Sequence, residues 1–239
     1  MNHNLSIIIF GKNTGNDVLC TIASVEAACS SILENYELIV VDDGSQTPLD
    51  EATYRSISKK ISRIIYIPKS IGISGAILRA AESCKFNNVL PIPGHDMFSK
   101  QAILNVISLM GQGRLIIGCR NNLSEERPLV KKIASRILRD LYRHLTFYFV
   151  GDIHGLILYQ KEDLLRFLIE NGRHSNAIRV VTPILAEGGL LIQTIAPINK
   201  GHDNRSSRRL SDSFPSLRNV LVTINALVWA RRLYSNEIK

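Results

Sequence analysis

Short, continuous apolar runs alternate along this chain with longer segments of helical pattern. Residues 6–10 (SIIIF), 37–41 (ELIVV) and 63–67 (RIIYI) are rich in β-branched side chains and lack a regular polar alternation. Runs of this kind are typical of strands that are buried on both faces of a sheet. Because each run is followed by a helical segment, the sequence predicts an α/β fold with a mostly parallel sheet flanked by helices.

The remaining elements extend this alternation over most of the chain. Helices are predicted at residues 17–33, 49–61, 72–85, 100–112, 127–148, 161–170, 176–187 and 215–234, and further strands at residues 88–92, 114–118, 153–159 and 190–197. Residues 200–212 are polar and rich in Arg and Ser, which predicts a loop. We expect one domain over residues 1–212. Residues 213–239 would form a small C-terminal helical lobe, an amphipathic helix packed on the domain or on a membrane surface.

Length and composition limit the classes of function. A chain of 239 residues with 45% hydrophobic residues is long enough to bury a core of its own. Its net charge of +8 favours an anionic partner. Aromatic residues make up only 6% and no nucleic-acid-binding motif is recognisable, so we expect no nucleic-acid partner. The polar start of the sequence predicts no signal peptide, and scattered cysteines indicate free thiols, so we expect a cytoplasmic protein.

Polar residues follow the predicted strands at the point where each strand ends. They are Gly11-Lys12-Asn13, Asp42-Asp43-Gly44-Ser45, Lys69-Ser70-Ile71-Gly72, His95-Asp96 and Cys119-Arg120. Ligands of open parallel sheets bind outside the carboxyl ends of the strands. Each segment alone is also typical of an ordinary turn or helix cap. Together, at one edge of one sheet, these segments predict a binding site.

The segment Val40-Val41-Asp42-Asp43-Gly44-Ser45 resembles the V-D-D-G-S motif that follows the second strand of family 2 glycosyltransferases. Further segments resemble other motifs of that family in the same order: residues 6–13 (SIIIFGKN), 70–76 (SIGISGA), 89–96 (VLPIPGHD), 118–120 (GCR), 152–155 (DIHG) and 202–205 (HDNR). The last segment is similar to the late H-x-x-R segment of members that act on polyprenol phosphates. The resemblance runs from about residue 6 to residue 209.

The resemblance implies a GT-A-type, Rossmann-like fold. It also implies a glycosyltransferase that moves a sugar, with inversion, from a nucleotide-diphosphate sugar to a polyprenyl-phosphate or other glycan-assembly acceptor. Asp96 is placed as a ligand of a divalent cation, Mg²⁺ or Mn²⁺, and Asp152 and Arg205 are placed as catalytic residues. Nucleotide-sugar binding falls on residues at the strand ends and in the late segment: Phe10, Asn13, Asp42, Asp43, Gly44, Ser45, Gly72, His95, Arg120 and Arg209.

The chemistry of these side chains agrees with the implied roles. Carboxylates such as Asp42 and Asp43 accept hydrogen bonds from a base or ribose, and a carboxylate such as Asp96 suits a hard cation that bridges a diphosphate. A guanidinium such as that of Arg205 suits phosphate oxygens. Asp152 is a general base if the acceptor is a sugar hydroxyl. A phosphate acceptor is already anionic, and Asp152 would then orient other groups or assist the metal.

The sequence also departs from the family pattern. Phe10 stands where the family has Pro, Thr14 stands where it has Glu, and Gly94-His95-Asp96 replaces the acidic D-x-D motif, so one carboxylate remains. Imidazole matches Mn²⁺ and softer metals better than Mg²⁺. Two alternatives therefore stay open. One is a saccharide-acceptor transferase of polysaccharide or lipopolysaccharide synthesis, and the other is a catalytically degenerate homologue that binds a nucleotide.

Two predicted helices are candidates for contact with a membrane. In residues 127–148, a set of basic side chains shares one helical face: Lys132, Arg136, Arg139 and Arg143. The helix at residues 215–234 is amphipathic. Such helices bind an anionic leaflet, although core packing produces the same pattern. The uncharged run at residues 219–230 is shorter than the roughly 20 residues that span a bilayer. We therefore expect peripheral association at the inner face of the membrane as the second location.

Overall fold

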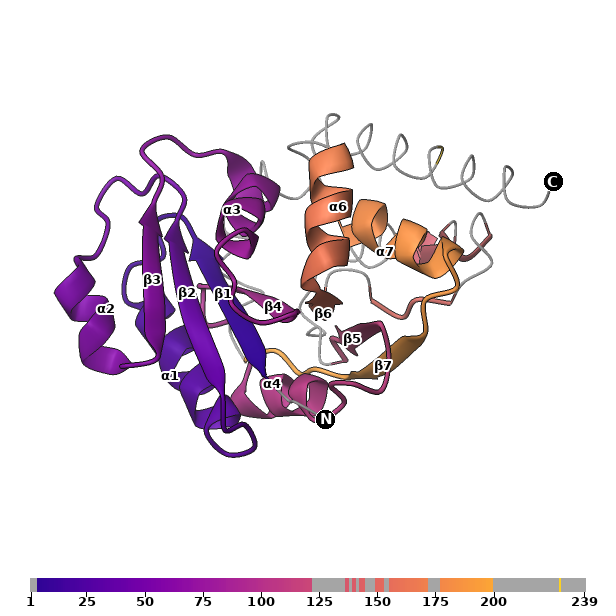
Figure 1. Ribbon diagram of the computed structural model, residues 1–239, viewed down its shortest axis with the longest axis horizontal. Helices are drawn as coiled ribbons and strands as arrows, with labels where there is room; N and C mark the ends of the chain where they lie inside the picture. The colour runs from indigo at the N-terminus through magenta and orange to yellow at the C-terminus, as the bar shows by residue number, and fades with distance from the viewer. Residues whose placement is uncertain are drawn as a thin grey trace.

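A computed structural model of the protein describes residues 4–121, 136, 137, 139, 140, 142–144, 149–152, 155–171, 177–199 and 228. Within this part of the chain, seven strands form one sheet in the order β3-β2-β1-β4-β6-β5-β7 (Figure 1). The strands are β1 (Leu5–Gly11), β2 (Tyr36–Asp42), β3 (Ile61–Tyr66), β4 (Asn88–Pro93), β5 (Leu115–Cys119), β6 (Leu156–Gln160) and β7 (Leu191–Ile195). The predicted α/β class is confirmed.

Helices cover both faces of this sheet (Figure 1). One layer consists of α1 (Asp17–Cys29), α2 (Glu51–Ile57) and α4 (Lys100–Ile107). The other layer consists of α3 (Gly72–Ala81), α6 (Lys161–Asn171) and α7 (Ala177–Ala186). Each layer packs on the sheet through its own apolar cluster, so the described residues form two cores that share the sheet.

The strand β1 shows why the apolar runs are continuous. Leu5, Ile7 and Ile9 belong to the core on the α1 side, whereas Ile8 and Phe10 belong to the core on the α3 side. Successive side chains of a strand point to opposite faces, so a strand that is covered on both sides has no polar face. Full burial of one such side chain contributes about 1.5–3 kcal/mol, which makes β1 a strong organiser of both cores.

The strands do not all run in the same direction. The neighbouring strands β1 to β4 pair in parallel, as do β5 and β7, whereas β6 is antiparallel to both β4 and β5. Residues that precede β6 therefore reach the same sheet edge as residues that follow the other strands. Gly155 permits this approach, because a Cβ at this position would lie 1.8 Å from the carbonyl oxygen of Gly118.

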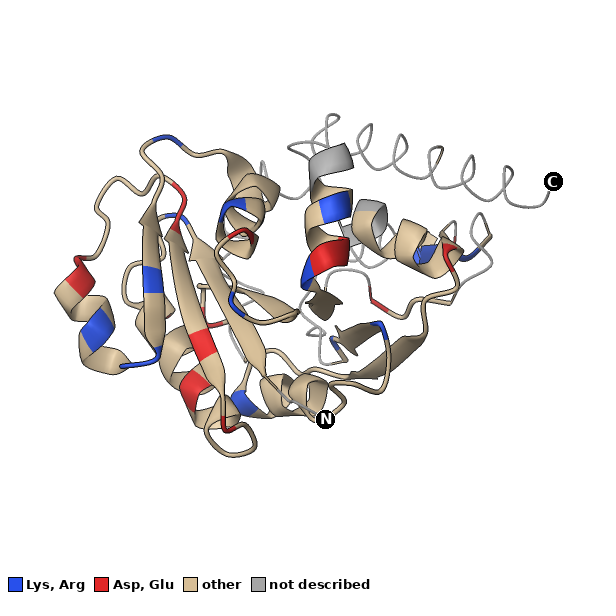
Figure 2. Cartoon of the chain, in the orientation of Figure 1, with Lys and Arg blue, Asp and Glu red and all other residues tan. Residues whose placement is uncertain are grey.

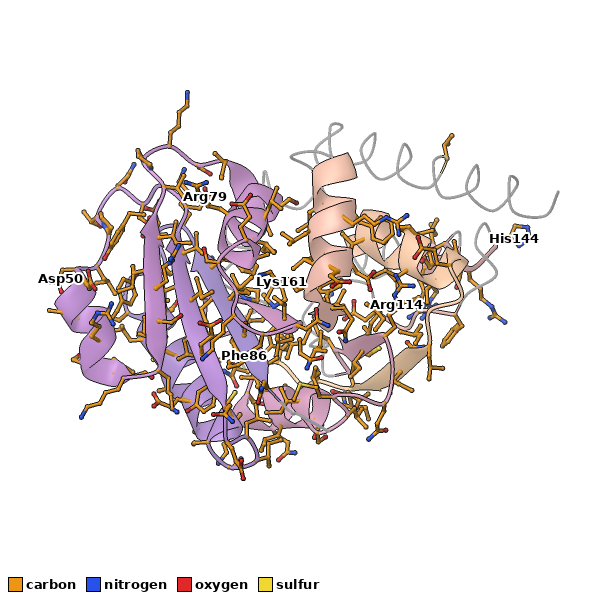
Figure 3. The ribbon with its side chains drawn as sticks, in the orientation of Figure 1. Asp50, Arg79, Phe86, Arg114, His144 and Lys161 are labelled. Atoms are coloured by element: carbon orange, nitrogen blue, oxygen red, sulfur yellow. The ribbon has the colours of Figure 1, made fainter. Side chains whose placement is uncertain are left out.

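Ion pairs attach α6 and α7 to the start of β5. Arg114, which is labelled in Figure 3, donates through Nε to Asp163 of α6 (2.8 Å) and through Nη2 to Glu187 after α7 (2.9 Å). Hydrogen bonds to Asp163 and then to Glu187 raise the pKa of Arg114 above its ordinary value. Other basic residues lie on α2, β3 and α6 (Figure 2), so the basic charge of the described residues is not confined to one element.

Most of the predicted helices are longer than the observed ones, whereas the helix predicted at residues 161–170 is Lys161–Asn171. The helix expected at residues 17–33 ends at Cys29, where the Ser30 hydroxyl donates back to the Glu26 carbonyl (2.6 Å). Serine hydroxyls compete in this way with continued helix formation. Three more helices are shorter than predicted: 49–61 is Glu51–Ile57, 72–85 is Gly72–Ala81 and 100–112 is Lys100–Ile107. Among the strands, 114–118 is Leu115–Cys119, 153–159 is Leu156–Gln160 and 190–197 is Leu191–Ile195.

Several predictions concern residues outside the described part of the chain. They are the loop at residues 200–212, the helix at residues 215–234 apart from position 228, and the domain boundary at residue 212. Of the helix predicted at residues 127–148, the positions described between residues 136 and 144 are helical. Among the described residues, no helix has both the length and the apolar character needed to cross a bilayer.

Candidate active site

The loops that follow β1 and β2 are tied together by Asn13 and Ser45. The backbone N–H of Asn13 donates to Ser45 Oγ (2.7 Å), and Asn13 Oδ1 accepts from the backbone N–H of Gln46 (2.9 Å). Asn13 has a positive φ of 52°, a conformation that Asn tolerates better than most residues. Two predicted site residues therefore meet at the carboxyl edge of the sheet.

Asp42, the last residue of β2, is a buried carboxylate that is 7% exposed. Its Oδ1 accepts from the backbone N–H of Ser45 (2.8 Å), which closes the turn after the strand. Burial, followed by the charge of Asp42, raises the pKa of Tyr54 to about 12, so the carboxylate faces the α2 layer. Within the described residues Oδ2 accepts no hydrogen bond, which leaves an acceptor for a ligand at this position.

Asp43 points to the opposite face and holds the loop before α3. Its Oδ1 accepts from the backbone N–H of Ile71 (2.8 Å), and its Oδ2 accepts from Ser70 Oγ (2.7 Å) and from the backbone N–H of Gly72 (3.0 Å). Gly44 permits this approach, since its φ is 76° and a Cβ would lie 2.7 Å from the nitrogen of Ser70. Both oxygens of Asp43, a predicted nucleotide-binding residue, are therefore used within the protein.

Asp96 lies after β4 at the same edge and has a positive φ of 53°. Its backbone N–H donates to Thr21 Oγ1 (2.8 Å). The side-chain amide of Asn199 donates to the Asp96 carbonyl (2.8 Å) and to Oδ1 of the Asp96 carboxylate (3.1 Å). Asn199 also donates its backbone N–H to the Met97 carbonyl (2.8 Å). The orientation of Asp96 is thus set by α1 on one side and by the chain after β7 on the other.

Asn199 was not predicted as a site residue. The other predicted segments are polar residues that follow a strand of the parallel set. Asn199 follows β7 in the same way. Its sequence neighbours Pro197 and Ile198 give no further sign of a role. Asn199 immediately precedes the Arg-rich stretch at residues 200–212, so the chain enters that stretch beside Asp96.

The donor set at Asp96 suits a cation that arrives with a nucleotide. Among the described residues, no group of three or more His, Cys, Asp and Glu side chains is arranged to hold a metal ion. Asp96 is half-buried and the adjacent His95 is exposed. Mg²⁺ is commonly held by one or two carboxylates, substrate phosphates and water, so a single carboxylate at this edge fits such a cation.

Arg120 and Asp152 form an ion pair between the end of β5 and the start of β6. Asp152 Oδ2 accepts from the backbone N–H (3.1 Å) and from Nε (2.6 Å) of Arg120, and Oδ1 accepts from Nη2 (3.0 Å). The two side chains are 14% and 12% exposed. Bidentate pairs of this kind are among the strongest hydrogen-bonded contacts in proteins. The structure therefore joins two predicted site residues as mutual partners.

The other predicted site residues are distributed as follows. Phe10 is 9% exposed and belongs to the core on the α3 side, while its carbonyl accepts from the backbone N–H of Gly94 (2.8 Å). Gly72 begins α3 with a φ of 82°. Arg205 and Arg209 lie outside the described residues. Asp42 ends β2, and the other described candidates Asn13, Ser45, Asp96 and Arg120 follow strands at the same edge of the sheet.

Residues 6–167 match the sequence profile of the family described as Glycosyl transferase family 2, and the chain belongs to this family. It is 22% identical over 219 residues to the undecaprenyl-phosphate 4-deoxy-4-formamido-L-arabinose transferase of Photorhabdus laumondii, a match that covers 91% of this chain and 65% of that protein. The transferase of the same name from Yersinia enterocolitica is 24% identical over 184 residues, covering 76% and 55%. The chain thus spans less than two thirds of the length of these relatives. The predicted family is confirmed.

Solved structures show the same fold. The mannosyl-3-phosphoglycerate synthase of Rubrobacter xylanophilus superposes with a TM-score of 0.66 at 16% identity, covering 99% of this chain and 75% of that one. The glucosyl-3-phosphoglycerate synthase of Mycobacterium tuberculosis, in complex with Mn²⁺, uridine diphosphate and glucosyl-3-phosphoglycerate, superposes with a TM-score of 0.62 at 16% identity, covering 94% and 79%. The predicted GT-A-type fold is confirmed by these neighbours.

Proposed function

We propose that this protein is a glycosyltransferase that moves a sugar from a nucleotide-diphosphate sugar to a polyprenyl-phosphate acceptor. The observation that carries the proposal is the Arg120–Asp152 pair, in which both oxygens of Asp152 are bound by one guanidinium. A hydroxyl acceptor needs a free base, whereas an acceptor phosphate needs no base and is attracted by a cation. The two bacterial relatives are undecaprenyl-phosphate sugar transferases, which supports the same acceptor class.

The donor side of the proposal rests on the loops after β1, β2 and β4. The nearly buried carboxylate of Asp42 has an oxygen without a hydrogen bond among the described residues, and a buried polar atom is costly unless it is bonded. An N–H of a base or an O–H of a ribose would satisfy it. Asp96 would bind Mg²⁺ or Mn²⁺ on the diphosphate. The Mycobacterium tuberculosis neighbour, which was solved with Mn²⁺ and uridine diphosphate, supports this assignment.

In the proposed reaction, an oxygen of the acceptor phosphate forms the new bond to the anomeric carbon. The bond from that carbon to the diphosphate oxygen breaks, its electron pair leaves with the diphosphate, and the anomeric configuration inverts. Asp152 keeps Arg120 oriented towards the acceptor phosphate. Arg205 and Arg209, which the sequence places in the late segment, would bind the departing diphosphate. A divalent cation, when bound, neutralises charge on the leaving group.

The membrane part of the proposal concerns where the acceptor is met. A polyprenyl chain resides in a bilayer, so the protein would work at the inner membrane face as a peripheral enzyme. Arg136, Ile137 and Arg139 are described in the basic segment and all are exposed. Exposed basic and apolar side chains in one helical segment suit the interface of an anionic leaflet.

The test compares variants of the ion pair in a transfer assay with a short-chain polyprenyl phosphate. The donor is first identified by calorimetric titration with UDP, GDP, CDP and their sugars, with and without Mg²⁺ or Mn²⁺. Arg120→Met should raise the acceptor KM about 10–100-fold, the loss of a charge-assisted contact. Asp152→Asn should raise that KM by a smaller factor and leave kcat of the same order. Glu51→Gln, which breaks the exposed Arg55–Glu51 pair of α2, is the control.

Two results would contradict this function. A general base contributes about 10²–10⁴ in rate, so a loss of kcat of that size in Asp152→Asn, with a hydroxyl acceptor active, would indicate a saccharide-acceptor transferase. Selective nucleotide binding without transfer to any acceptor would indicate the degenerate homologue. The replacement of the acidic motif by Gly94-His95-Asp96 is the specific observation that favours this second candidate.

A further inference from the structure

Gln193 lies in the edge strand β7, where it pairs with Ile117 of β5. Its side-chain amide makes hydrogen bonds to the segment 149–152. Oε1 accepts from the backbone N–H of Gly151 (2.8 Å), and Nε2 donates to the carbonyl of Phe149 (2.8 Å). A carbonyl and an N–H two residues apart are the groups that a neighbouring strand would bind. The side-chain amide of Gln193 thus makes the hydrogen bonds to the segment 149–152 that a peptide group of a neighbouring strand would make.

The segment 149–152 is held on the sheet by more than this amide. Val150 is 3% exposed and packs in the core on the α3 side. Gly151 sits so close that a Cβ would lie 3.1 Å from Cys119 Sγ and 3.3 Å from Gln193 Oε1. The Cys119 thiol also donates to Gln193 Oε1 (3.5 Å). The Gln193 amide is therefore the point where β5, β7 and the segment 149–152 are joined.

The next residue along each chain segment forms the ion pair of the candidate site. Asp152 follows Gly151, and Arg120 follows Cys119. The Arg120–Asp152 ion pair therefore lies one residue further along each segment than the contacts of Gly151 and Cys119 with Gln193. A displacement of Gly151 from Gln193 is transmitted through one peptide unit to the carboxylate that orients Arg120. We infer that Gln193 is a positioning residue for the Asp152–Arg120 pair, and that it sets the geometry with which Arg120 meets an acceptor phosphate. The second half of this inference rests on the proposed function.

The chemistry of the position requires an amide of this length. Glutamate could accept from Gly151 but could not donate to the Phe149 carbonyl, and it would add a negative charge near Asp152. Methionine has a similar length and can make neither hydrogen bond effectively. Gln193→Met is therefore the informative substitution, and Gln193→Glu is a second variant that removes only the donated bond.

The matched control is Gln160→Met. Gln160 is the last residue of β6, whereas the segment 149–152 precedes the start of that strand. The Gln160 amide also accepts one hydrogen bond, from Asn87 Nδ2 (2.7 Å), and donates one, to Asn88 Oδ1 (3.2 Å). The same substitution there removes the same kinds of bonds in the same sheet but does not touch the segment 149–152. A general loss of stability would therefore affect both variants, whereas a positioning effect would appear only for Gln193.

The experiment measures proton exchange of the Arg120 Nε–H by NMR, with the signal assigned from its absence in Arg120→Lys. Exchange should be at least about tenfold faster in Gln193→Met than in wild type, since weakening of the local hydrogen bonds exposes this proton, and unchanged in Gln160→Met. Gln193→Glu should show the same direction and is decisive if Gln193→Met does not fold. Unchanged exchange in a folded Gln193 variant would overturn the positioning role.

A kinetic measurement separates this inference from the proposed function. Gln193→Met should raise the KM for the polyprenyl phosphate about five- to tenfold and leave the Kd of the nucleotide within about twofold, because the donor loops are untouched. If Arg120→Lys leaves that KM unchanged, the acceptor role of Arg120 is wrong, while the exchange measurement still decides whether Gln193 holds the pair. An equal rise of KM in Gln160→Met would contradict the inference.

Discussion

Replacement of Asp43 by Asn should lower the free energy of unfolding by about 2–4 kcal/mol. The carboxylate accepts three hydrogen bonds, from the hydroxyl of Ser70 and from the backbone N–H groups of Ile71 and Gly72. An amide has one acceptor oxygen, so in either orientation its NH₂ group faces one of the two backbone N–H groups. An orphaned buried donor costs about 1–3 kcal/mol, and the bonds that remain lose their charge assistance.

The assay is urea unfolding followed by circular dichroism at neutral pH. Asp50→Asn is the matched control, because the exposed Asp50 carboxylate accepts from the backbone N–H of Thr53 (2.6 Å) as the N-cap of α2. Asparagine caps helices as well as aspartate, so the control should unfold like the wild type. An unchanged stability of Asp43→Asn together with a loss of nucleotide binding would refute this reasoning. Asp43 would then act on the ligand and not on the loop before α3.

Further substitutions test the site and the cores. Asn199→Ala should abolish the strengthening of nucleotide binding by Mn²⁺ that we expect calorimetry to show for the wild type, because the Asp96 carboxylate loses its orienting amide. Gly155→Ala should cost about 3 kcal/mol or more in urea unfolding, because backbone has to move. Burial, and then the charge of Glu26, raises the pKa of the Cys29 thiol from 9.0 to about 12, so the folded thiol stays protonated where the unfolded one ionises. The contribution of the protonated Cys29 thiol to the free energy of unfolding is complete below pH 9 and is lost as the pH rises towards 12. The stability difference between wild type and Cys29→Ala, measured in urea, should therefore shrink by about 1.4 kcal/mol per pH unit above 9.

The sequence was a good guide to the elements and to the edge of the sheet where the site lies. Continuous β-branched runs arise because both faces of β1 and β2 are covered. Burial of both faces produces the same sequence pattern in other chains. The carboxyl ends of parallel strands meet at one edge, so Asn13, Ser45 and Asp42 could be placed together before any contact was known. Strand order and direction determine such neighbourhoods without reference to side-chain geometry.

The sequence was a poor guide to what each polar side chain binds. Asp42 and Asp43 are adjacent in one motif, yet the alternation of β2 sends them to opposite faces. One carboxylate keeps an oxygen for a ligand, and the other is used to hold a loop. Gln193 and Asn199 depend on contacts between residues that are far apart along the chain, 42 positions for Gln193 and Gly151 and 103 positions for Asn199 and Asp96. No local pattern encodes such contacts, although a polar residue inside an apolar strand is a sign worth testing.

The pairing of Asp152 with Arg120 depends on the direction of β6, which the residue pattern does not reveal. Because β6 is antiparallel to β4 and β5, Asp152 precedes β6 at the same edge of the sheet where Arg120 follows β5. The Asp152 carboxylate therefore contacts the Arg120 guanidinium. With a hydroxyl acceptor, Asp152 would take a proton, and its contacts with Arg120 would weaken because protonation removes the negative charge that holds the guanidinium. Breaking a buried ion pair costs about 3–5 kcal/mol, and at 14% and 12% exposure much of that cost would be added to the barrier. A phosphate acceptor would leave the pair intact and would be attracted by the cation that Asp152 keeps in place, so the direction of β6 supports the acceptor class of the proposed function.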